Sequence, residues 1–151
     1  MMLLPYVIPV ALFLGLVGYL ATPVHPAPEP VRPSFVVVDV IVTTEGPLAA
    51  WQVFVTCASE EAALVGVENG DVDAFPEAPH YDPAALRGHR IVLADYSLAD
   101  PTMLPSGRCR LASLHFEIPS GVEPVLTAQD VLCADADGVR LTGSVFLEIR
   151  R

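Results

Sequence analysis

The stretch richest in reactive side chains runs from Ala74 to Ser97 and reads AFPEAPHYDPAALRGHRIVLADYS. It contains two histidines, two tyrosines, three acids and three prolines. His80, Asp82 and His89 are of the types that bind zinc, but they lack the closely spaced histidine pairs and the cysteine pairs of zinc sites. The Asp-Pro step in the middle is typical of a turn. The pattern therefore favours an irregular loop that leads into the apolar strand RIVLADY over a metal-dependent active site.

Two acids near the C-terminus are the other candidate metal ligands. Asp135 and Asp137 lie in the segment ADADG. Their carboxylates are hard oxygen ligands, of which Ca²⁺ takes about six to eight. Two acids beside a glycine are also the composition of an ordinary β-turn, which is the more frequent use of such a segment. We expect a turn here, with calcium as the alternative and no other cofactor.

The three cysteines, Cys57, Cys109 and Cys133, form an odd set. Outside the cytoplasm, one disulfide would leave the third thiol free, and the sequence leaves all three pairings open. None of the three lies in a nucleophile motif, and the chain has neither a Gly-rich phosphate loop nor a G-x-S-x-G segment. We therefore expect no catalytic residue and predict that the protein is not an enzyme.

The charge of the chain excludes one class of partner. Its 8 basic residues stand against 18 acidic ones, which gives a formal net charge of −10. Such a field repels phosphate backbones, so nucleic-acid binding is not expected. With 52% hydrophobic residues, the 151-residue chain can bury one core, and we expect a single folded domain.

The first 21 residues, MMLLPYVIPVALFLGLVGYLA, carry no charged side chain. About 20 apolar residues in a helix span about 30 Å, the thickness of the hydrocarbon core of a bilayer. No Lys or Arg precedes this run and Tyr19 stands two places before Ala21, so an uncleaved anchor fits better than a signal peptide, with cleavage as the alternative. Residues 22–34 are rich in proline and predict an extended spacer. We therefore expect a transmembrane anchor or signal helix at 1–21, a linker at 22–34 and a domain at 35–151.

From Phe35 onward the sequence has the short, alternating, β-branched runs of an all-β domain. FVVVDVIVTT places alternate valines on one face and further apolar residues on the other, which implies a strand covered on both sides for part of its length. AAWQVFVTC alternates more cleanly and assigns Trp51 to the core. In CRLASLHFEI, the alternation turns Ser113 and His115 toward the wetter face. AALVGVENGD predicts a strand closed by an Asn-Gly turn at Gly70. The number of short strands, without an amphipathic helix after the anchor, predicts a β-sandwich.

The order of these segments resembles that of cohesin-like domains. VVVDVIVTTEGPLAAWQVFVTCASEEAALVGVENGD resembles the opening strands, and RIVLADYS, RLASLHFEI and LTAQDVLCADADGVRLTGSVFLEI resemble the paired middle strands and the closing hairpin. The resemblance implies a jelly-roll β-sandwich of about nine strands, a fold shared with carbohydrate-binding modules. It also implies a protein-binding role, because cohesins recognise dockerins through one sheet face. The segments FPEAPHYDPAAL, RIVLADYS and LPSGRCRLASLHFEI also resemble those of membrane-anchored bacterial proteins that carry one such domain. No dockerin-contact residue is carried over to this chain.

Together these observations predict a non-catalytic interaction module outside the cytoplasm, held at the membrane by residues 1–21 or secreted if that segment is cleaved. Its expected partner is another protein, bound through a sheet face or through the loop that begins the opening stretch. A module that binds cell-surface polysaccharide is the alternative, and it would need exposed flat aromatic side chains. The candidate binding residues are Phe75, His80, Tyr81, Asp82, His89 and Tyr96.

Overall fold

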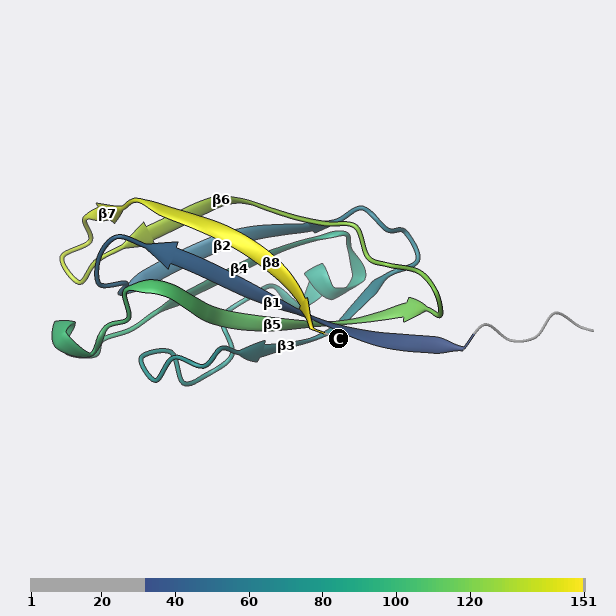
Figure 1. Ribbon diagram of the computed structural model, residues 1–151, viewed down its shortest axis with the longest axis horizontal. Helices are drawn as coiled ribbons and strands as arrows, with labels where there is room; N and C mark the ends of the chain where they lie inside the picture. The colour runs from purple at the N-terminus through teal and green to yellow at the C-terminus, as the bar shows by residue number, and fades with distance from the viewer. Residues whose placement is uncertain (1–31, 151) are drawn as a thin grey trace, which may run out of the picture.

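The computed structural model describes residues 32–150, which form eight strands in two four-stranded antiparallel sheets (Figure 1). The β1 sheet has the order β3-β5-β1-β8, and the β2 sheet has the order β4-β2-β6-β7. The strands are β1 (Pro33–Thr44), β2 (Ala50–Cys57), β3 (Ala63–Asn69), β4 (Arg90–Tyr96), β5 (Gly107–Pro119), β6 (Leu126–Ala134), β7 (Arg140–Leu141) and β8 (Gly143–Arg150). Two short 3₁₀ helices, η1 (Pro83–Arg87) and η2 (Pro101–Met103), lie in the loops. The expected all-β sandwich is confirmed.

The core lies between the two sheets, on the faces that the alternation predicted. Val38, Val40 and Val42 of β1 are fully buried, and Trp51 and Val53 of β2 are buried with them. Branched side chains on alternate positions of a strand all point to one face, so two such strands in facing sheets share one core. Burial of each large apolar side chain contributes roughly 1.5–3 kcal/mol, which makes this layer a main source of stability.

The described residues form eight strands where about nine were expected. The segment before η1 forms only an isolated antiparallel bridge between His80 and Ala94 of β4. Two backbone hydrogen bonds make it, from the N–H of His80 to the carbonyl of Ala94 at 2.8 Å and in the reverse direction at 3.0 Å. Pro79 and Pro83 lie close on either side in the chain, and because proline has no N–H donor the bridge does not extend into a full strand.

β3 ends at Asn69, where the sequence predicted the end of a strand, but the chain does not turn back there to pair with the next strand, because β3 pairs with β5. Gly70 has a different role. A Cβ atom built on it would lie 1.8 Å from the backbone oxygen of Arg110 in β5. Only a residue without a side chain allows this approach of two backbones. The glycine therefore lets the chain leave β3 tightly against the edge of the sandwich.

The sandwich has two ends. At the proximal end β1 begins and β8 ends, and Val37 is paired with Arg150 (Figure 1, right). At the distal end lie the loops of residues 45–49, 70–79, 97–106 and 135–139 (Figure 1, left). Both ends of the described chain are therefore on the proximal side.

The predicted anchor at 1–21 lies outside the described residues, as do residues 22–31 of the predicted linker. β1 already begins at Pro33, two residues before the predicted start of the domain. Within residues 32–150, no helix has the length and apolar character needed to cross a membrane.

Candidate functional site

A groove of about 440 Å³ lies on the outer face of the β2 sheet, near the distal end. Directly opposite residues of antiparallel strands point to the same face, so β4, β2 and β6 present their outward side chains in rows. The row nearest the distal end is Tyr96, Ala50 and Ala134, and the next row is Ala94, Gln52 and Leu132. The groove is thus built by three strands that are far apart in sequence.

The groove is hollow because three of these residues are alanines. Ala50, Ala94 and Ala134 project only a methyl group, whereas Tyr96 and Leu132 are large and 61% and 43% exposed. An alanine floor between two exposed large side chains forms a concave and mainly apolar surface. Surfaces of this kind take a side chain of a ligand or a partner protein.

A stacked pair of rings bounds the groove on the β4 side. His80 stacks on Tyr96 with ring centroids 6.5 Å apart and an angle of 19° between the planes. A second hollow of about 330 Å³ is lined by the same two residues together with Glu77, Asp95 and the highly exposed Leu98. The His80–Tyr96 pair therefore lies between two neighbouring hollows, and Asp95 lines both of them.

The β6–β7 hairpin bounds the groove on the opposite side, where it contributes Gly138 and Arg140. The carboxylate of Asp135 accepts hydrogen bonds from the backbone N–H of Asp137 at 3.0 Å and of Val139 at 2.8 Å. The predicted turn is therefore confirmed, and Asp135 holds it in place. Residues 32–150 contain no group of three or more side chains that could hold a metal ion, and calcium at Asp135 and Asp137 stays a prediction.

Of the six candidate binding residues, the structure brings His80 and Tyr96 together at the groove. A third candidate, Phe75, is buried. It is 2% exposed and packs edge-to-face against Trp51, with ring centroids 6.4 Å apart. Phe75 belongs to the core, so its ring is not available to stack on a ligand.

The remaining three candidates lie away from the groove. Tyr81 is half-buried and packs against the core. Asp82 caps η1 by accepting a hydrogen bond from the backbone N–H of Ala84 at 2.9 Å. The carbonyl of His89 accepts a hydrogen bond from the N–H of Cys57, where β2 ends. Because the loop runs back along β4 toward the proximal end, its reactive groups do not form one site.

The three cysteines are free thiols in the structure. Trp51 pairs with Cys133 in the β2–β6 ladder, whereas Cys57 lies six positions further along β2. At the rise of a strand, six residues place Cys57 about 20 Å from Cys133, well beyond the reach of a disulfide between these two cysteines. Burial raises the pKa of Cys109, as does the charge of Asp71, and burial also raises the pKa of Cys133 against the opposing effect of Arg140. Both groups are therefore held as thiols, which are weak nucleophiles.

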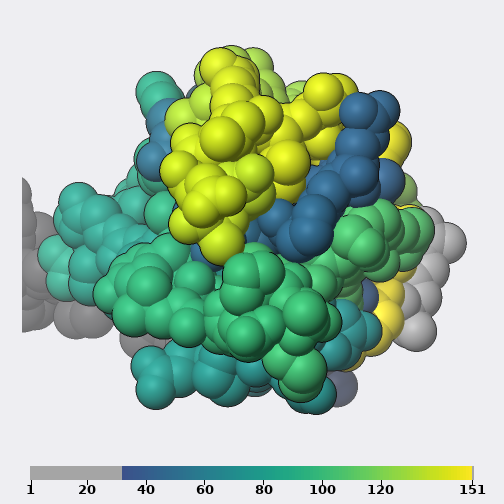
Figure 2. Space-filling model, turned by 90° about the vertical axis from the view of Figure 1, so that its left-hand side faces the viewer, coloured from purple at the N-terminus to yellow at the C-terminus, as the bar shows by residue number. Residues whose placement is uncertain are grey.

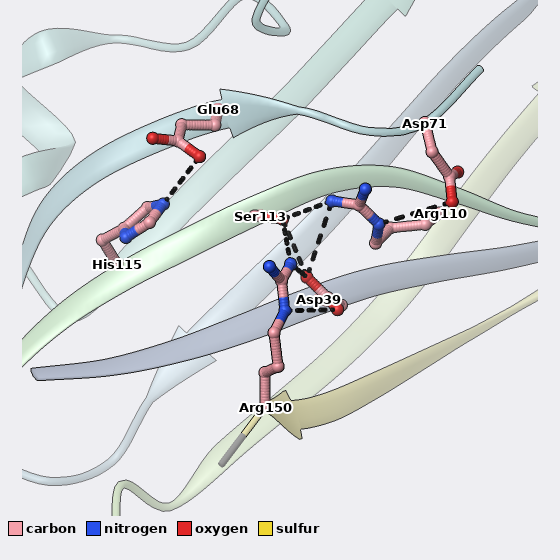
Figure 3. A network of polar contacts seen from close by, with 7 residues as sticks. All are labelled: Asp39, Glu68, Asp71, Arg110, Ser113, His115 and Arg150. Atoms are coloured by element: carbon pink, nitrogen blue, oxygen red, sulfur yellow. Dashed lines mark hydrogen bonds and ion pairs between the residues drawn. The ribbon is translucent and has the colours of Figure 1, made fainter.

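The outer face of the β1 sheet carries a network of polar side chains instead of a groove (Figure 3). Asp39 of β1 lies at its centre and accepts a hydrogen bond from Ser113 Oγ at 2.7 Å and from Arg150 Nε at 3.2 Å. Ser113 in turn accepts hydrogen bonds from Arg110 at 2.8 Å and from Arg150 at 3.1 Å. Arg110 also lies 3.6 Å from Asp71. Here the polar groups satisfy one another.

The electrostatics of this network centre on one carboxylate. Burial would raise the pKa of Asp39, but the hydrogen bonds from Arg150 and Ser113 and the charges of Arg150 and Arg110 outweigh it and hold the pKa below its ordinary value. Nearby, His115 Nε2 lies 3.1 Å from Glu68 Oε2. The face is therefore internally paired and offers no uncovered charge for a ligand at its centre.

No protein-family model and no curated protein matches the sequence. Solved structures match the fold. A non-cellulosomal cohesin from the hyperthermophilic archaeon Archaeoglobus fulgidus is similar with a TM-score of 0.58 and 16% sequence identity, over 77% of this chain and 81% of that chain. The fold is cohesin-like. A chain of a type I cohesin–dockerin complex from Clostridium thermocellum is similar to the cohesin-like domain with a TM-score of 0.55 and 14% identity, over 75% of this chain and 83% of that chain.

Sequence reasoning missed most of the groove in this cohesin-like domain. The signal was present as an outward-facing alanine in each of three strands, namely Ala50, Ala94 and Ala134. Alternation predicts that these methyl groups point outward, but it does not predict that the three strands are neighbours. Strand order and register, which depend on contacts distant in sequence, bring the alanines together.

Proposed function

We propose that this chain is a non-catalytic interaction module whose cohesin-like domain binds another protein through the groove on the outer face of the β2 sheet. The alanine floor beside the exposed Tyr96 and Leu132 carries the proposal. Such a surface binds when a partner places a bulky side chain in it, since the apolar area of both sides is then removed from water.

The surroundings of the groove support a protein partner. Gln52 and Arg140 place polar groups beside the apolar floor, which is the arrangement of a protein interface with an apolar centre and a polar rim. One structure of similar fold is a complex between a cohesin and a dockerin. That likeness supports a protein as the class of partner, and it leaves the identity of the partner to experiment.

The proposal includes the location of the domain. The uncharged, apolar residues 1–21 fit a membrane anchor, and the proline-rich segment after them fits a spacer. We place the cohesin-like domain outside the cytoplasm on this tether. The groove is near the distal end, whereas β1 begins at the proximal end, so a tether that enters through β1 leaves the groove uncovered.

The test is capture of proteins from detergent-solubilised native membranes with the full-length chain as bait. The variant Ala94→Arg places a long, charged side chain on the alanine floor, and we expect it to lose the captured partner. Ala63→Arg is the matched control, because it makes the same change at an exposed strand position on the β1 sheet. A protein that the wild type and both variants capture equally does not use the groove, and that outcome would refute the proposal.

A polysaccharide array tests the alternative function, a carbohydrate-binding module. It is run with the wild type and with the Ala94→Arg and Ala63→Arg variants. Tyr96 is the exposed aromatic ring at the groove, and Tyr81 is not exposed beside it. A sugar platform built from both rings is therefore not present. Binding to a glycan that Ala94→Arg removes, without any captured protein, would replace the proposal with a carbohydrate-binding module.

A further inference from the structure

The loops of the distal end, each of which adjoins a residue that lines the groove, carry charge of one sign. Residues 45–49, 70–79, 97–106 and 135–139 contain no Lys, Arg or His. They contain seven carboxylates, namely Glu45, Asp71, Asp73, Glu77, Asp100, Asp135 and Asp137. Figure 2 looks onto this end, where the loops, blue, teal, green and yellow in chain order, lie together.

The loops of the proximal end differ. Residues 58–62, 81–89 and 120–125 contain four acids together with Arg87 and His89. Arg90 begins β4 and Arg150 ends β8 at the same end. The strands next to the distal loops add three arginines, namely Arg108, Arg110 and Arg140. With the arginines of both ends counted, the distal end still has the larger excess of carboxylates.

Several distal carboxylates are not used to hold the domain together. Asp100 and Asp135 accept backbone hydrogen bonds that fix η2 and the β6–β7 turn. In contrast, Glu45, Asp73 and Glu77 make no side-chain hydrogen bond or ion pair with another residue of the described range 32–150. Glu77 also lines the hollow next to the groove. Charges that serve no internal contact but surround a candidate binding surface are available to a partner.

We infer that the protein that occupies the groove presents a basic surface, with Lys or Arg side chains around the apolar side chain that sits on the alanine floor. This inference rests on the proposed function. Opposite charge on the partner speeds encounter and rejects acidic competitors. The alanine floor supplies apolar contact, and the distal carboxylates select the partner by charge.

The groove also fixes the direction in which the partner lies. Glu77 and Asp95 are on the side of the His80–Tyr96 pair, whereas Arg140 is on the opposite side. The basic side chains of the partner therefore belong on the β4 side, because beside β7 the guanidinium of Arg140 lies next to the turn that carries Asp135 and Asp137.

The first experiment selects a displayed library of random peptides against the full-length chain in detergent, with Ala94→Arg as the counter-selection. The expected result is that peptides dependent on the groove are enriched in Lys and Arg relative to the unselected library. Neutral or acidic groove-dependent peptides would overturn the basic-partner inference and leave the proposed function standing. A selection without any groove-dependent peptide would count against both.

The second experiment compares two matched triple variants with the best selected peptide as the probe. The distal variant is Glu45→Gln, Asp73→Asn and Glu77→Gln, and the proximal variant is Glu60→Gln, Glu61→Gln and Glu117→Gln. Both remove three negative charges, but only the first removes them from the loops of the distal end. We expect the distal variant to weaken binding roughly tenfold at low salt and the proximal variant less than about twofold, with the gap closing in about 0.5 M salt. Equal effects of the two variants would show that the position of the charges is irrelevant.

Discussion

The outer faces of the two sheets differ in whether their side chains contact one another. On the β1 sheet, Asp39, Ser113 and Arg150 bond to one another, and Ser113 is only 1% exposed. On the β2 sheet, the alanines leave a hollow, and Tyr96 and Leu132 remain exposed beside it. The first face contributes to stability, and the second is open to a partner. Substitutions on the two faces should therefore separate stability from binding.

The largest expected effect is on the face of the β1 sheet. Asp39→Ala leaves Arg150 and Ser113 without their common acceptor and Arg110 without an ion-pair partner, and we expect the free energy of unfolding to fall by about 2–3 kcal/mol. Urea denaturation monitored by Trp51 fluorescence measures this change. Ala94→Arg, a substitution at a partly exposed position on the other face, should change it by less than about 1 kcal/mol. A similar loss of unfolding free energy in the two variants would contradict the proposal that the β1 sheet face stabilises the fold and the β2 sheet face serves binding.

The next effect is on binding. Tyr96→Ala removes the exposed ring that stacks on His80, and we expect affinity for the captured partner to fall roughly 30-fold, the effect of losing an aromatic anchor worth about 2 kcal/mol. Isothermal titration with the purified partner gives the dissociation constant. Phe146→Ala, which removes an exposed ring from β8 in the other sheet, is the control and should leave affinity unchanged. Loss of affinity in the control alone would move the binding site to the β1 sheet.

A smaller effect should appear at acid pH. The pKa of Asp39 lies below the ordinary value of about 3.9, so its network stabilises the fold fully above that value and loses this contribution as pH falls through the folded-state pKa. The difference in unfolding free energy between wild type and Asp39→Asn should be constant from about pH 7 to pH 5 and shrink below about pH 4. Urea titrations at each pH measure it. A difference that is the same at pH 3 and pH 7 would mean that the Asp39 carboxylate does not titrate as its contacts require.

The smallest effect sharpens the comparison within one face. Arg108 and Glu148 form an ion pair on the β1 sheet, but both side chains are more than half exposed. Exposed pairs contribute little because water and salt screen them, so Arg108→Ala should change the free energy of unfolding by less than about 0.5 kcal/mol. The same urea assay applies, with Asp39→Ala as the reference. A loss as large as that of Asp39→Ala would show that burial is not what separates the two pairs.

Period-two alternation predicted the strand part of the core. It placed Trp51 inward and the alternate valines of β1 on one face, and the structure buries Trp51, Val38, Val40 and Val42. It did not predict Phe75 and Leu48, which reach the core from loops. It also turned Ser113 outward, which is correct for direction but not for exposure. Asp39, Arg110 and Arg150 cover Ser113, and two of these lie on other strands. Alternation predicts the face of the sheet to which a side chain points, whereas the exposed fraction of that side chain depends on residues of the neighbouring strands.

The candidate site was harder to predict because reactive side chains drew attention to one loop. His80 and Tyr96 were found in that way, but Asp82 and His89 turned out to serve the loop and the proximal end. The groove depends more on the small side chains of its three alanines than on reactive side chains. A methyl group on an outward strand position carries no chemical signal until register places two more beside it.

The pairing of Val37 with Arg150 has a practical consequence for building multivalent reagents. Because the described chain enters and leaves the sandwich on the same side, a second copy fused after the last residue would start near the base of the first. A short flexible linker would then keep two grooves close to each other, at an effective concentration in the millimolar range. Such a fusion should retain a two-site target far longer than a single domain, without any change at the binding surface.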